Sequence, residues 1–452
     1  MGPAVAIVGG GPSGLAAAHH LRRRGCTVVV IDEGARVGGK LQTVRHEGFV
    51  METGAALVSS AYDALLEIAV DIGVAGDLVP AASGLSIARD GRVHRIDTDH
   101  LLRDGIRTGV LSWRSKVRAL RLAIDGWKAR AMLSFEDLSV AAPIDVETAE
   151  EYCRRRLNDE IYDYVVDSTM RGINGTSGSQ VSVVEFFFAV AKVLGSDLFS
   201  FRGGMSSFAE AMVADLDVRT ESRVSAVADR GDAVIVEWVD HVGAHRSEVF
   251  DGCVVAIAGD LVPSIVHGLD TEAVAFLESL RYSSMVNLNL ARSSAPAESW
   301  GLCLQIPRPV SERLFTISFD HTNPAGRAPS GAGLLGLYTT AEWAQELIEA
   351  DDDVVVAAVL DEAERVLPGC TDDAVHVRVN RWPRSLVYSR PGLYRALGRF
   401  QRVRGRAGRV ALAGDYFSSS NLNTAATAGR RAARELAAVL GSDVGAPTGA
   451  TR

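Results

Sequence analysis

The chain has 452 residues, of which 47% are hydrophobic and 23% are charged, as is typical of a folded globular protein. Its 47 Lys and Arg against 56 Asp and Glu give a formal net charge of −9, whereas a duplex nucleic-acid binder usually carries a positive excess. This composition excludes a disordered tail, a fibrous repeat and a small disulfide scaffold, and it predicts two or three domains with a sizeable core.

The first forty residues predict a strand, a glycine turn, a helix and a second strand. The apolar runs Ala4–Val8 and Thr27–Ile31 are typical of buried parallel strands, and the Ala-, Leu- and Arg-rich stretch 15–24 favours a helix. Asp32 closes the second strand. The turn after the first strand fits the pattern GxGxxG and contains Gly9, Gly11, Pro12, Ser13 and Gly14.

This turn predicts a dinucleotide-binding site, for a different reason at each glycine. Gly9 permits the tight turn, Gly11 lets a pyrophosphate approach the backbone, and Gly14 lets the helix pack closely on the strand. The helix N-terminus favours phosphate charge, and Asp32 stands where a carboxylate reaches the adenosine ribose. The alternative is a glycine-rich turn without a ligand, which the complete strand–turn–helix–strand context disfavours.

The stretch RVGGK from Arg36 to Lys40 resembles the RxGG(R/K) motif of the flavin-containing amine oxidase superfamily. That superfamily includes monoamine oxidases, protoporphyrinogen oxidases and phytoene-desaturase-like enzymes. The resemblance implies FAD, with this stretch along its diphosphate, and the stretch from Glu52 to Ala56 resembles the next element, beside the flavin ring. A solvated surface pair is the alternative for the two cations. The FAD-binding residues implied here are Glu33, Arg36, Gly38, Gly39, Lys40, Gly54, Ala55 and Ala56.

The middle of the chain resembles the protoporphyrinogen-oxidase-like branch in the stretches 111–120, 147–175 and 201–205. Helical composition dominates 113–133 and 147–170. The stretch 220–238 predicts a strand pair, in which the superfamily places Val224 near the adenine. Monoamine oxidases keep a lysine near flavin N5, where this chain has Asn287, which weighs against a straightforward amine oxidase. No cysteine follows Cys370, so the resemblance implies FAD that is not covalently bound.

The C-terminal part predicts a strand at 410–413, then Gly414 and Asp415, a polar loop and a helix at 424–440. This order resembles the C-terminal flavin motif of the superfamily, in which Asp415 would bond the ribityl or phosphate region. Backbone N–H groups near Leu422, Asn423 and Thr424 would then face flavin N1 and O2, where a helix dipole stabilises negative charge. An ordinary terminal helix packed on the sheet is the alternative.

The resemblance implies an α/β fold in which a Rossmann-type FAD-binding domain is interleaved with an α+β substrate domain. The expected FAD-binding pieces are residues 1–85, 200–275 and 395–445. A helical substrate-domain insert at 86–199 and a mixed-sheet insert at 276–394 separate them, and a tail follows at 446–452. Strand-like runs at 302–306, 315–319 and 334–338 support the mixed sheet.

Two basic stretches run against the acidic total. From Arg103 to Arg130 there are eight Lys or Arg and two acidic residues, which suggests either weak contact with a membrane surface or a solvated helix face. We favour the solvated face, because Trp113 and Trp127 alone form a thin apolar anchor. From Arg378 to Arg409 there are ten Arg and no acidic residue. Two interpretations fit this stretch equally well: recognition of an anionic substrate, and Arg side chains scattered over both faces of a strand–loop–helix segment.

The sequence therefore predicts an FAD-dependent oxidoreductase that removes hydride from a C–C or C–N bond of a small molecule, with O2 or another acceptor reoxidising the flavin. The missing lysine favours C–C or ring desaturation. Alternatives are an amine oxidase proper and a proto- or coproporphyrinogen-type oxidase, then a nicotinamide-dependent dehydrogenase or a non-catalytic flavoprotein. No catalytic base is identified. The pocket-wall candidates, for whose aromatic members core packing is the alternative, are Arg171, Asn287, Trp382, Tyr388, Tyr416 and Phe417.

Neither a metal nor export is expected. The five cysteines lie far apart without CxxC spacing, which is typical of reduced thiols in a cytoplasm, and the ten histidines show no ligand spacing. The uncharged start lacks the features of a signal peptide, and no run of about 18 apolar residues predicts a spanning helix. We therefore expect a cytoplasmic protein whose partners are its substrate and an electron acceptor, without nucleic acid; the sequence does not define its oligomeric state.

Overall fold

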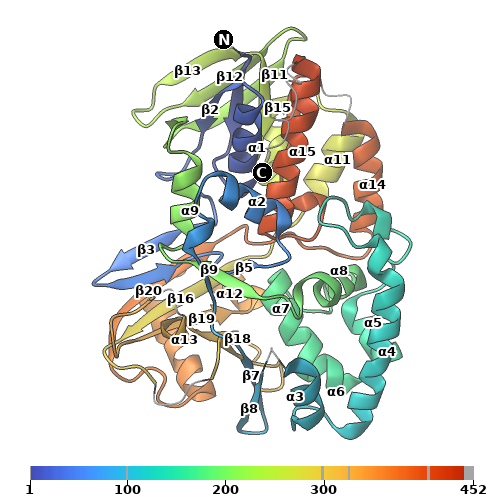
Figure 1. Cartoon of the computed structure of the whole chain (residues 1–452), viewed down its shortest axis with the longest axis vertical. Coiled ribbons are helices and arrows are strands. Elements are labelled where there is room, and N and C mark those ends of the chain that lie inside the picture. The colour runs from blue at the N-terminus through green and yellow to red at the C-terminus, as the bar shows by residue number, and fades with distance from the viewer. Residues whose placement is uncertain (1, 98–99, 297–299, 324–325, 405–407, 442–452) are drawn as a thin grey trace, which may run out of the picture.

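The computed structural model describes residues 2–97, 100–296, 300–323, 326–404 and 408–441. The expected tail at 446–452 lies outside these ranges. The described chain forms two halves, one built around a parallel sheet and the other around a seven-stranded sheet and a group of helices (Figure 1).

The parallel sheet joins strands from three distant parts of the chain, in the order β10-β2-β1-β14-β21. Helices α1 and α15 pack together against it, and a Cβ on Gly429 of α15 would lie 2.3 Å from the Ser13 carbonyl oxygen of α1. The bounds are β1 Ala4–Val8, β2 Thr27–Ile31, β10 Asp217–Arg219, β14 Gly252–Val255, β21 Val410–Leu412, α1 Pro12–Arg23 and α15 Leu422–Leu440.

Smaller elements surround the parallel sheet. A four-stranded sheet has the order β13-β12-β11-β15, a hairpin joins β3 and β4, and a three-stranded sheet has the order β5-β9-β6. The strands are β3 Thr43–His46, β4 Phe49–Glu52, β5 Val58–Ser59, β6 Leu78–Pro80, β9 Leu198–Phe201, β11 Arg223–Asp229, β12 Val234–Val239, β13 His245–Phe250 and β15 Val266–His267. The helices are α2 Asp63–Asp71, α9 Met205–Met212, α10 Val262–Ile265, α11 Thr271–Ser279 and α14 Leu393–Arg404.

The seven-stranded sheet has the order β20-β16-β19-β18-β17-β7-β8 and is mostly antiparallel. Helices α12 and α13 cover one face of this sheet. The apolar side chains of that face include Leu288 and Leu290 of β16. The opposite face carries Asn287 and Asn289. The bounds are β7 Leu85–Arg89, β8 Arg92–Ile96, β16 Met285–Arg292, β17 Cys303–Gln305, β18 Leu314–Phe319, β19 Gly333–Thr339, β20 Ala374–Trp382, α12 Ala341–Leu347 and α13 Asp352–Val366.

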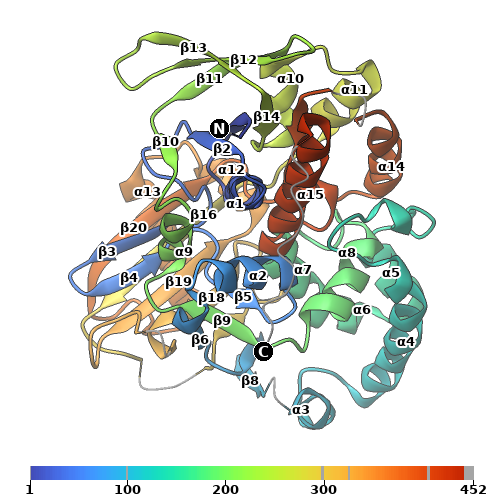
Figure 2. The ribbon, with the colours of Figure 1, turned by 45° about the horizontal axis from the view of Figure 1, so that its top comes forward.

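A group of helices completes the second half, and Figures 1 and 2 both place it at the side of the molecule away from the seven-stranded sheet's β20 edge. The bounds are α3 Leu101–Arg107, α4 Trp113–Ala129, α5 Ala149–Arg156, α6 Asp159–Ile161, α7 Asp167–Asn174 and α8 Val183–Phe188. The stretch expected to be a mostly helical insert also supplies β8 to the sheet. Its expected helix at 147–170 is interrupted at Leu157–Asn158 and contains a π-helical turn at Tyr162–Val166.

Candidate functional site

The glycine turn after β1 has the geometry of a phosphate cradle. Gly9 adopts a φ of 99°, and a Cβ on Gly14 would lie 1.9 Å from the Gly9 carbonyl oxygen, so the turn and helix fit only without side chains there. Gly11 is the N-cap of α1, and a Cβ on it would meet no atom within 4 Å. The open space therefore lies at the one glycine that the sequence assigns to the pyrophosphate.

The second glycine stretch lies directly against the first. Gly38 and Gly39 have φ values of 110° and 54°, and the Gly38 N–H donates to the Gly10 carbonyl at 2.7 Å. A Cβ on Gly39 would lie 3.1 Å from Gly11 Cα. The side chain of Arg36 is exposed and that of Lys40 is half-buried. Two glycine loops thus border the same space, as a diphosphate requires.

The adenosine end of the predicted site is marked by Asp32, at the end of β2. Its carboxylate accepts hydrogen bonds from the backbone N–H of Gly10 at 2.6 Å and of Gly34 at 2.8 Å, whereas Glu33 is exposed. The Ser222 N–H donates to the Asp32 carbonyl at 2.8 Å, which brings the start of β11, the strand that carries Val224, beside the end of β2. Binding of the adenosine by Asp32 and Val224 stays a prediction.

The loop before α15 comes from the far end of the chain. Ser420 donates to the carboxylate of Asp415, and the Asn421 side chain caps α15 by accepting from the Thr424 N–H at 2.9 Å. The N–H groups of Leu422 and Asn423 stand in the first turn, where a helix offers no internal acceptor. The Asn423 side chain instead caps α2, by accepting from the Leu65 N–H at 3.2 Å.

One side-chain atom at the start of α15 supports the prediction that a ligand binds there. The hydroxyl of Thr424 is completely buried, and its Oγ1 has no hydrogen-bond partner among the described residues. A buried polar atom without a partner is costly, so its position at a helix N-terminus fits an absent polar group.

The segment Thr53–Ala56 links the cradle to the seven-stranded sheet. Trp382 of β20 donates from Nε1 to the Thr53 carbonyl at 2.6 Å, and the Ala55 N–H donates to the Lys40 carbonyl at 3.0 Å. A Cβ on Gly54 would lie 2.4 Å from the Lys40 carbonyl oxygen and 3.2 Å from Trp382 Cζ2. The Ala56 carbonyl accepts from Ser200 at 3.5 Å. The Trp382 ring is therefore fixed beside Gly54.

Asn287 lies on the face of the sheet that carries Trp382. It pairs with Asn380 and Tyr338 on the neighbouring strands, it is 1% exposed, and its Nδ2 has no partner among the described residues. Two residues along β16, Asn289 donates to the Glu52 carbonyl at 3.2 Å. The same face thus touches the Glu52–Gly54 segment at two places and presents one buried amide donor between them.

Glu52 is a buried carboxylate that the sequence argument did not explain. It pairs with Arg327 at 3.0 Å and accepts hydrogen bonds from Thr43 at 2.7 Å and from the Met205 N–H at 3.1 Å. Burial raises the pKa of Glu52 to about 7, although Arg327 and the hydrogen bonds oppose that shift. No short-range motif could reveal this pair, because 275 residues (327 − 52) separate its members.

A pH dependence follows from this carboxylate. Its raised folded pKa gives stability that is complete below the unfolded pKa of 4.5 and is lost as pH rises through about 7. We expect Glu52→Gln, which mimics the neutral acid, to gain roughly 2–3 kcal/mol relative to the parent protein between pH 5 and 8. Urea unfolding of both proteins across this range measures the difference. A difference that does not change with pH would contradict the raised pKa.

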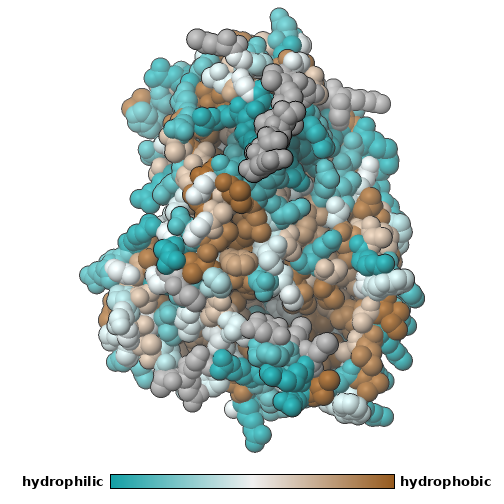
Figure 3. Space-filling view, in the orientation of Figure 1, coloured by the Kyte–Doolittle hydropathy of each residue, from teal (hydrophilic) through white to brown (hydrophobic). Residues whose placement is uncertain are grey.

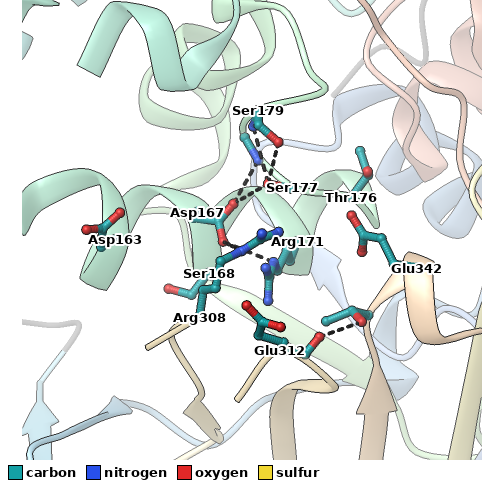
Figure 4. A network of polar contacts seen from close by, with 12 residues as sticks. Asp163, Asp167, Ser168, Arg171, Thr176, Ser177, Ser179, Arg308, Glu312 and Glu342 are labelled. Carbon is teal, nitrogen blue, oxygen red and sulfur yellow. Dashed lines mark hydrogen bonds and ion pairs between the residues drawn. The ribbon is translucent and has the colours of Figure 1, made fainter. Parts of the chain in front are cut away.

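Arg171 lies in a buried polar network on α7 (Figure 4). Its Nε is 3.0 Å from Asp167, its side chain is 2% exposed, and burial lowers its pKa. The other Asp167 oxygen accepts from Ser177 at 2.7 Å, and Arg308 approaches the carboxylate to 3.8 Å. One carboxylate therefore faces two cations, and the buried Nη1 of Arg171 has no hydrogen-bond partner among the described residues, so recognition of an anionic substrate by Arg171 stays a prediction.

The remaining pocket-wall candidates lie in two different parts of the protein, a surface groove and the main core. Tyr388 is half-buried and lines a groove of about 590 Å³ with Gln180 and Glu342. Tyr416 and Phe417 are 1% and 0% exposed and belong to the main core. The ring of Phe417 lies 3.6 Å from the guanidinium of Arg431, and Tyr416 stacks on Phe417 at 4.7 Å. These two contacts support the core-packing alternative.

Within the described ranges, no three His, Cys, Asp or Glu side chains gather as metal ligands, and no disulfide joins any of the five cysteines. No helix in the part of the chain described by the structure has both the length and the apolar character to cross a bilayer.

The family model, the similar sequences and the similar structures all point to one family of proteins. The family model described as flavin containing amine oxidoreductase matches residues 12–437. The chain is 22% identical over 414 residues to coproporphyrinogen III oxidase of Bacillus subtilis (strain 168), covering 84% of this chain and 86% of that protein. It is 24% identical over 434 residues to protoporphyrinogen oxidase 2, chloroplastic/mitochondrial, of Arabidopsis thaliana, covering 84% and 83%. Its fold matches cyclohexylamine oxidase from Brevibacterium oxydans IH-35A with a TM-score of 0.77 at 17% identity, over 98% and 99% of the two chains.

Proposed function

The chain belongs to the family of flavin containing amine oxidoreductases, and from this premise we propose that it desaturates a C–C or ring bond of a small molecule. It is an FAD-dependent oxidoreductase with the two-domain fold of that family. The observation that carries the proposal is Asn287, a neutral amide on the site-facing side of β16. That side of the strand, which the structure describes completely, consists of Met285, Asn287, Asn289 and Ala291 and contains no lysine.

The residues present fit FAD along its whole length. Asp32 and Val224 would hold the adenosine, and the N-terminus of α1 with Gly11 and Gly39 would hold the diphosphate. Gly54, Trp382 and the first turn of α15 would surround the flavin ring. When bound, FAD supplies a hydride acceptor that passes two electrons to O2 or to another acceptor.

The protein's own contribution is to bind and orient the substrate. Trp382, fixed by its bond to the Thr53 carbonyl, would form one wall, and the free Nδ2 of Asn287 would donate a hydrogen bond to a polar substrate atom. The burial of Asn287 excludes water from that bond. In the proposed reaction the substrate loses a hydride and a proton, and O2 that receives both electrons and two protons becomes H2O2.

The relatives support two substrate classes. Those named coproporphyrinogen III oxidase and protoporphyrinogen oxidase favour a reduced tetrapyrrole ring, whereas the name cyclohexylamine oxidase represents C–N oxidation. The absent lysine favours the first class for this chain. Among the five cysteines, all of them in the described ranges, no disulfide is formed, which supports the cytoplasm as the compartment.

The test combines a spectrum with anaerobic substrate addition. Protein that releases FAD on heating is mixed without O2 with a porphyrinogen, or with an amine panel that includes cyclohexylamine. We expect the porphyrinogen to bleach the flavin and subsequent O2 to restore its colour with formation of H2O2. Bleaching by amines alone would overturn C–C oxidation, and protein that binds no FAD would overturn the cofactor assignment.

Asn287 gives a sharper prediction. We expect Asn287→Ala to slow anaerobic flavin reduction by about tenfold, the value of one lost hydrogen bond, because only a donor to the substrate is removed. FAD content and melting temperature should stay close to those of the parent protein. Stopped-flow absorbance measures the reduction rate. An unchanged rate would show that this amide does not touch the substrate.

A further inference from the structure

Helix α4 presents an apolar stripe to the outside of the molecule. Trp113, Val117, Leu120, Ile124 and Trp127 have exposed fractions of 70%, 50%, 67%, 57% and 63%. Their alternating spacing of four and three residues places all five within an arc of about 80° on one side of the helix. From the sequence, Trp113 and Trp127 alone form a thin apolar anchor, and the structure adds three aliphatic residues between them.

The opposite side of α4 holds the helix on the protein. Ser115, Gly126 and Ala129 are buried there, and Leu122 packs against the main core. The stripe therefore points away from the fold over a length of about 21 Å. In Figure 3, brown hydrophobic residues lie along the edge of the molecule where Figure 1 draws α4.

Positive charge borders this stripe. Arg114, Arg121 and Lys128 are exposed along one flank, and Lys116 lies on the other. Asp125 is the one acidic residue of α4, all of which the structure describes, and it is paired with Arg156 at 2.8 Å. The two sides of the stripe thus carry charge of one sign.

The neighbouring helix α3 extends the same surface. Lys116 donates from Nζ to the carbonyls of Ile106 and Thr108, each at 2.6 Å, which holds the end of α3 beside α4. Ile106 is 62% exposed there. The apolar surface therefore continues past the start of α4.

The charge pattern selects among partners for this surface. Pairing of two copies through the stripe would bring like charges together along both flanks, which disfavours a dimer through α4. In a bilayer with anionic lipids, the apolar stripe can insert between the headgroups, and the negative headgroups attract the flanking cations. We propose that α4 lies flat on an anionic lipid surface, with its five apolar side chains inserted at the headgroup level.

Vesicle sedimentation of the full-length holoenzyme tests this surface. We expect binding to phosphatidylserine–phosphatidylcholine vesicles, much weaker binding to phosphatidylcholine alone, and weaker binding at high salt. The double variant L120E/I124E should bind at least about tenfold more weakly. Replacing Arg121 and Lys128 by Gln should cost about fivefold per charge removed.

A matched control introduces two glutamates on an exposed surface away from α4. Val242 and Val249 are 69% and 63% exposed in the β12–β13 region, so V242E/V249E should bind vesicles as the parent protein does. Equal FAD content in all variants shows that they are folded, so binding is read independently of the proposed reaction. The proposal is overturned if L120E/I124E binds like the parent, or if the parent is a dimer that this variant converts to monomers.

Discussion

The Gly11→Val variant is expected to fold and to purify without its flavin. The added side chain meets no protein atom within 4 Å of its Cβ position, and the extended backbone at Gly11 suits any residue. The same side chain would fill the space that the diphosphate needs. We expect FAD affinity to fall on the order of 100-fold or more, while the stability of the apoprotein changes by less than about 1 kcal/mol.

Gly14→Ala is the matched comparison, because it adds one methyl group three residues further along. Its Cβ would lie 1.9 Å from the Gly9 carbonyl oxygen, so the helix must shift away from the strand. This variant should lose stability even as the apoprotein. Flavin titration by fluorescence and urea unfolding of both apoproteins separate the two effects. If Gly11→Val retained FAD, the cradle would be assigned to the wrong space.

The second large effect is expected at Glu185, a carboxylate of α8 that is 1% exposed. It accepts hydrogen bonds from Tyr394 of α14, from Asn174 of α7 at 2.8 Å and from Ser419 before α15 at 2.7 Å. Glu185→Ala leaves three buried donors without an acceptor, and each costs about 1–3 kcal/mol. We expect a loss of about 3–5 kcal/mol in urea unfolding. FAD binding should also weaken, because Ser419 lies in the polar loop 418–421 before α15, the flavin loop of the predicted site.

Glu185→Gln is the control for this network. It keeps the shape and one acceptor oxygen but replaces the other with a donor that faces donors, so its loss of stability should be smaller than that of Glu185→Ala. Tyr394→Phe removes only one donor and should cost the least. If all three variants were equally stable, the network would not join the helices of the second half to the flavin loop.

The local parts of the nucleotide site could be predicted from the sequence. The strands at Ala4–Val8 and Thr27–Ile31 have the predicted bounds, and the C-terminal helix begins at Leu422, two residues before its predicted start. These elements were predictable because strand period, glycine position and helix composition act over a few neighbouring residues. The first helix starts at Pro12 rather than Leu15, since proline suits the first helical turn.

Contacts between distant segments were not predictable in the same way. Glu52 with Arg327, and Trp382 with the Thr53 carbonyl, depend on how the two halves meet, and no local pattern encodes that. Aromatic residues show the same limit. Trp382 lies beside the predicted flavin segment, whereas Phe417, named on equal grounds, is packed under Arg431 in the core. The exposed stripe of α4 did carry a local signal, its alternating spacing of four and three residues, which the sequence argument did not use.

The contact between α1 and α15 has a consequence for how the protein is made. The strand β1 can pair with β2 early, but its other neighbour β14 follows about 250 residues later, and the sheet is complete only when β21 has left the ribosome. One edge of β1 therefore lacks its partner strand during about half of synthesis, and a nascent chain that stops before α15 lacks one wall of its nucleotide site. Loading of the flavin is thus a late event, and early termination yields a chain prone to aggregation rather than a partly active enzyme.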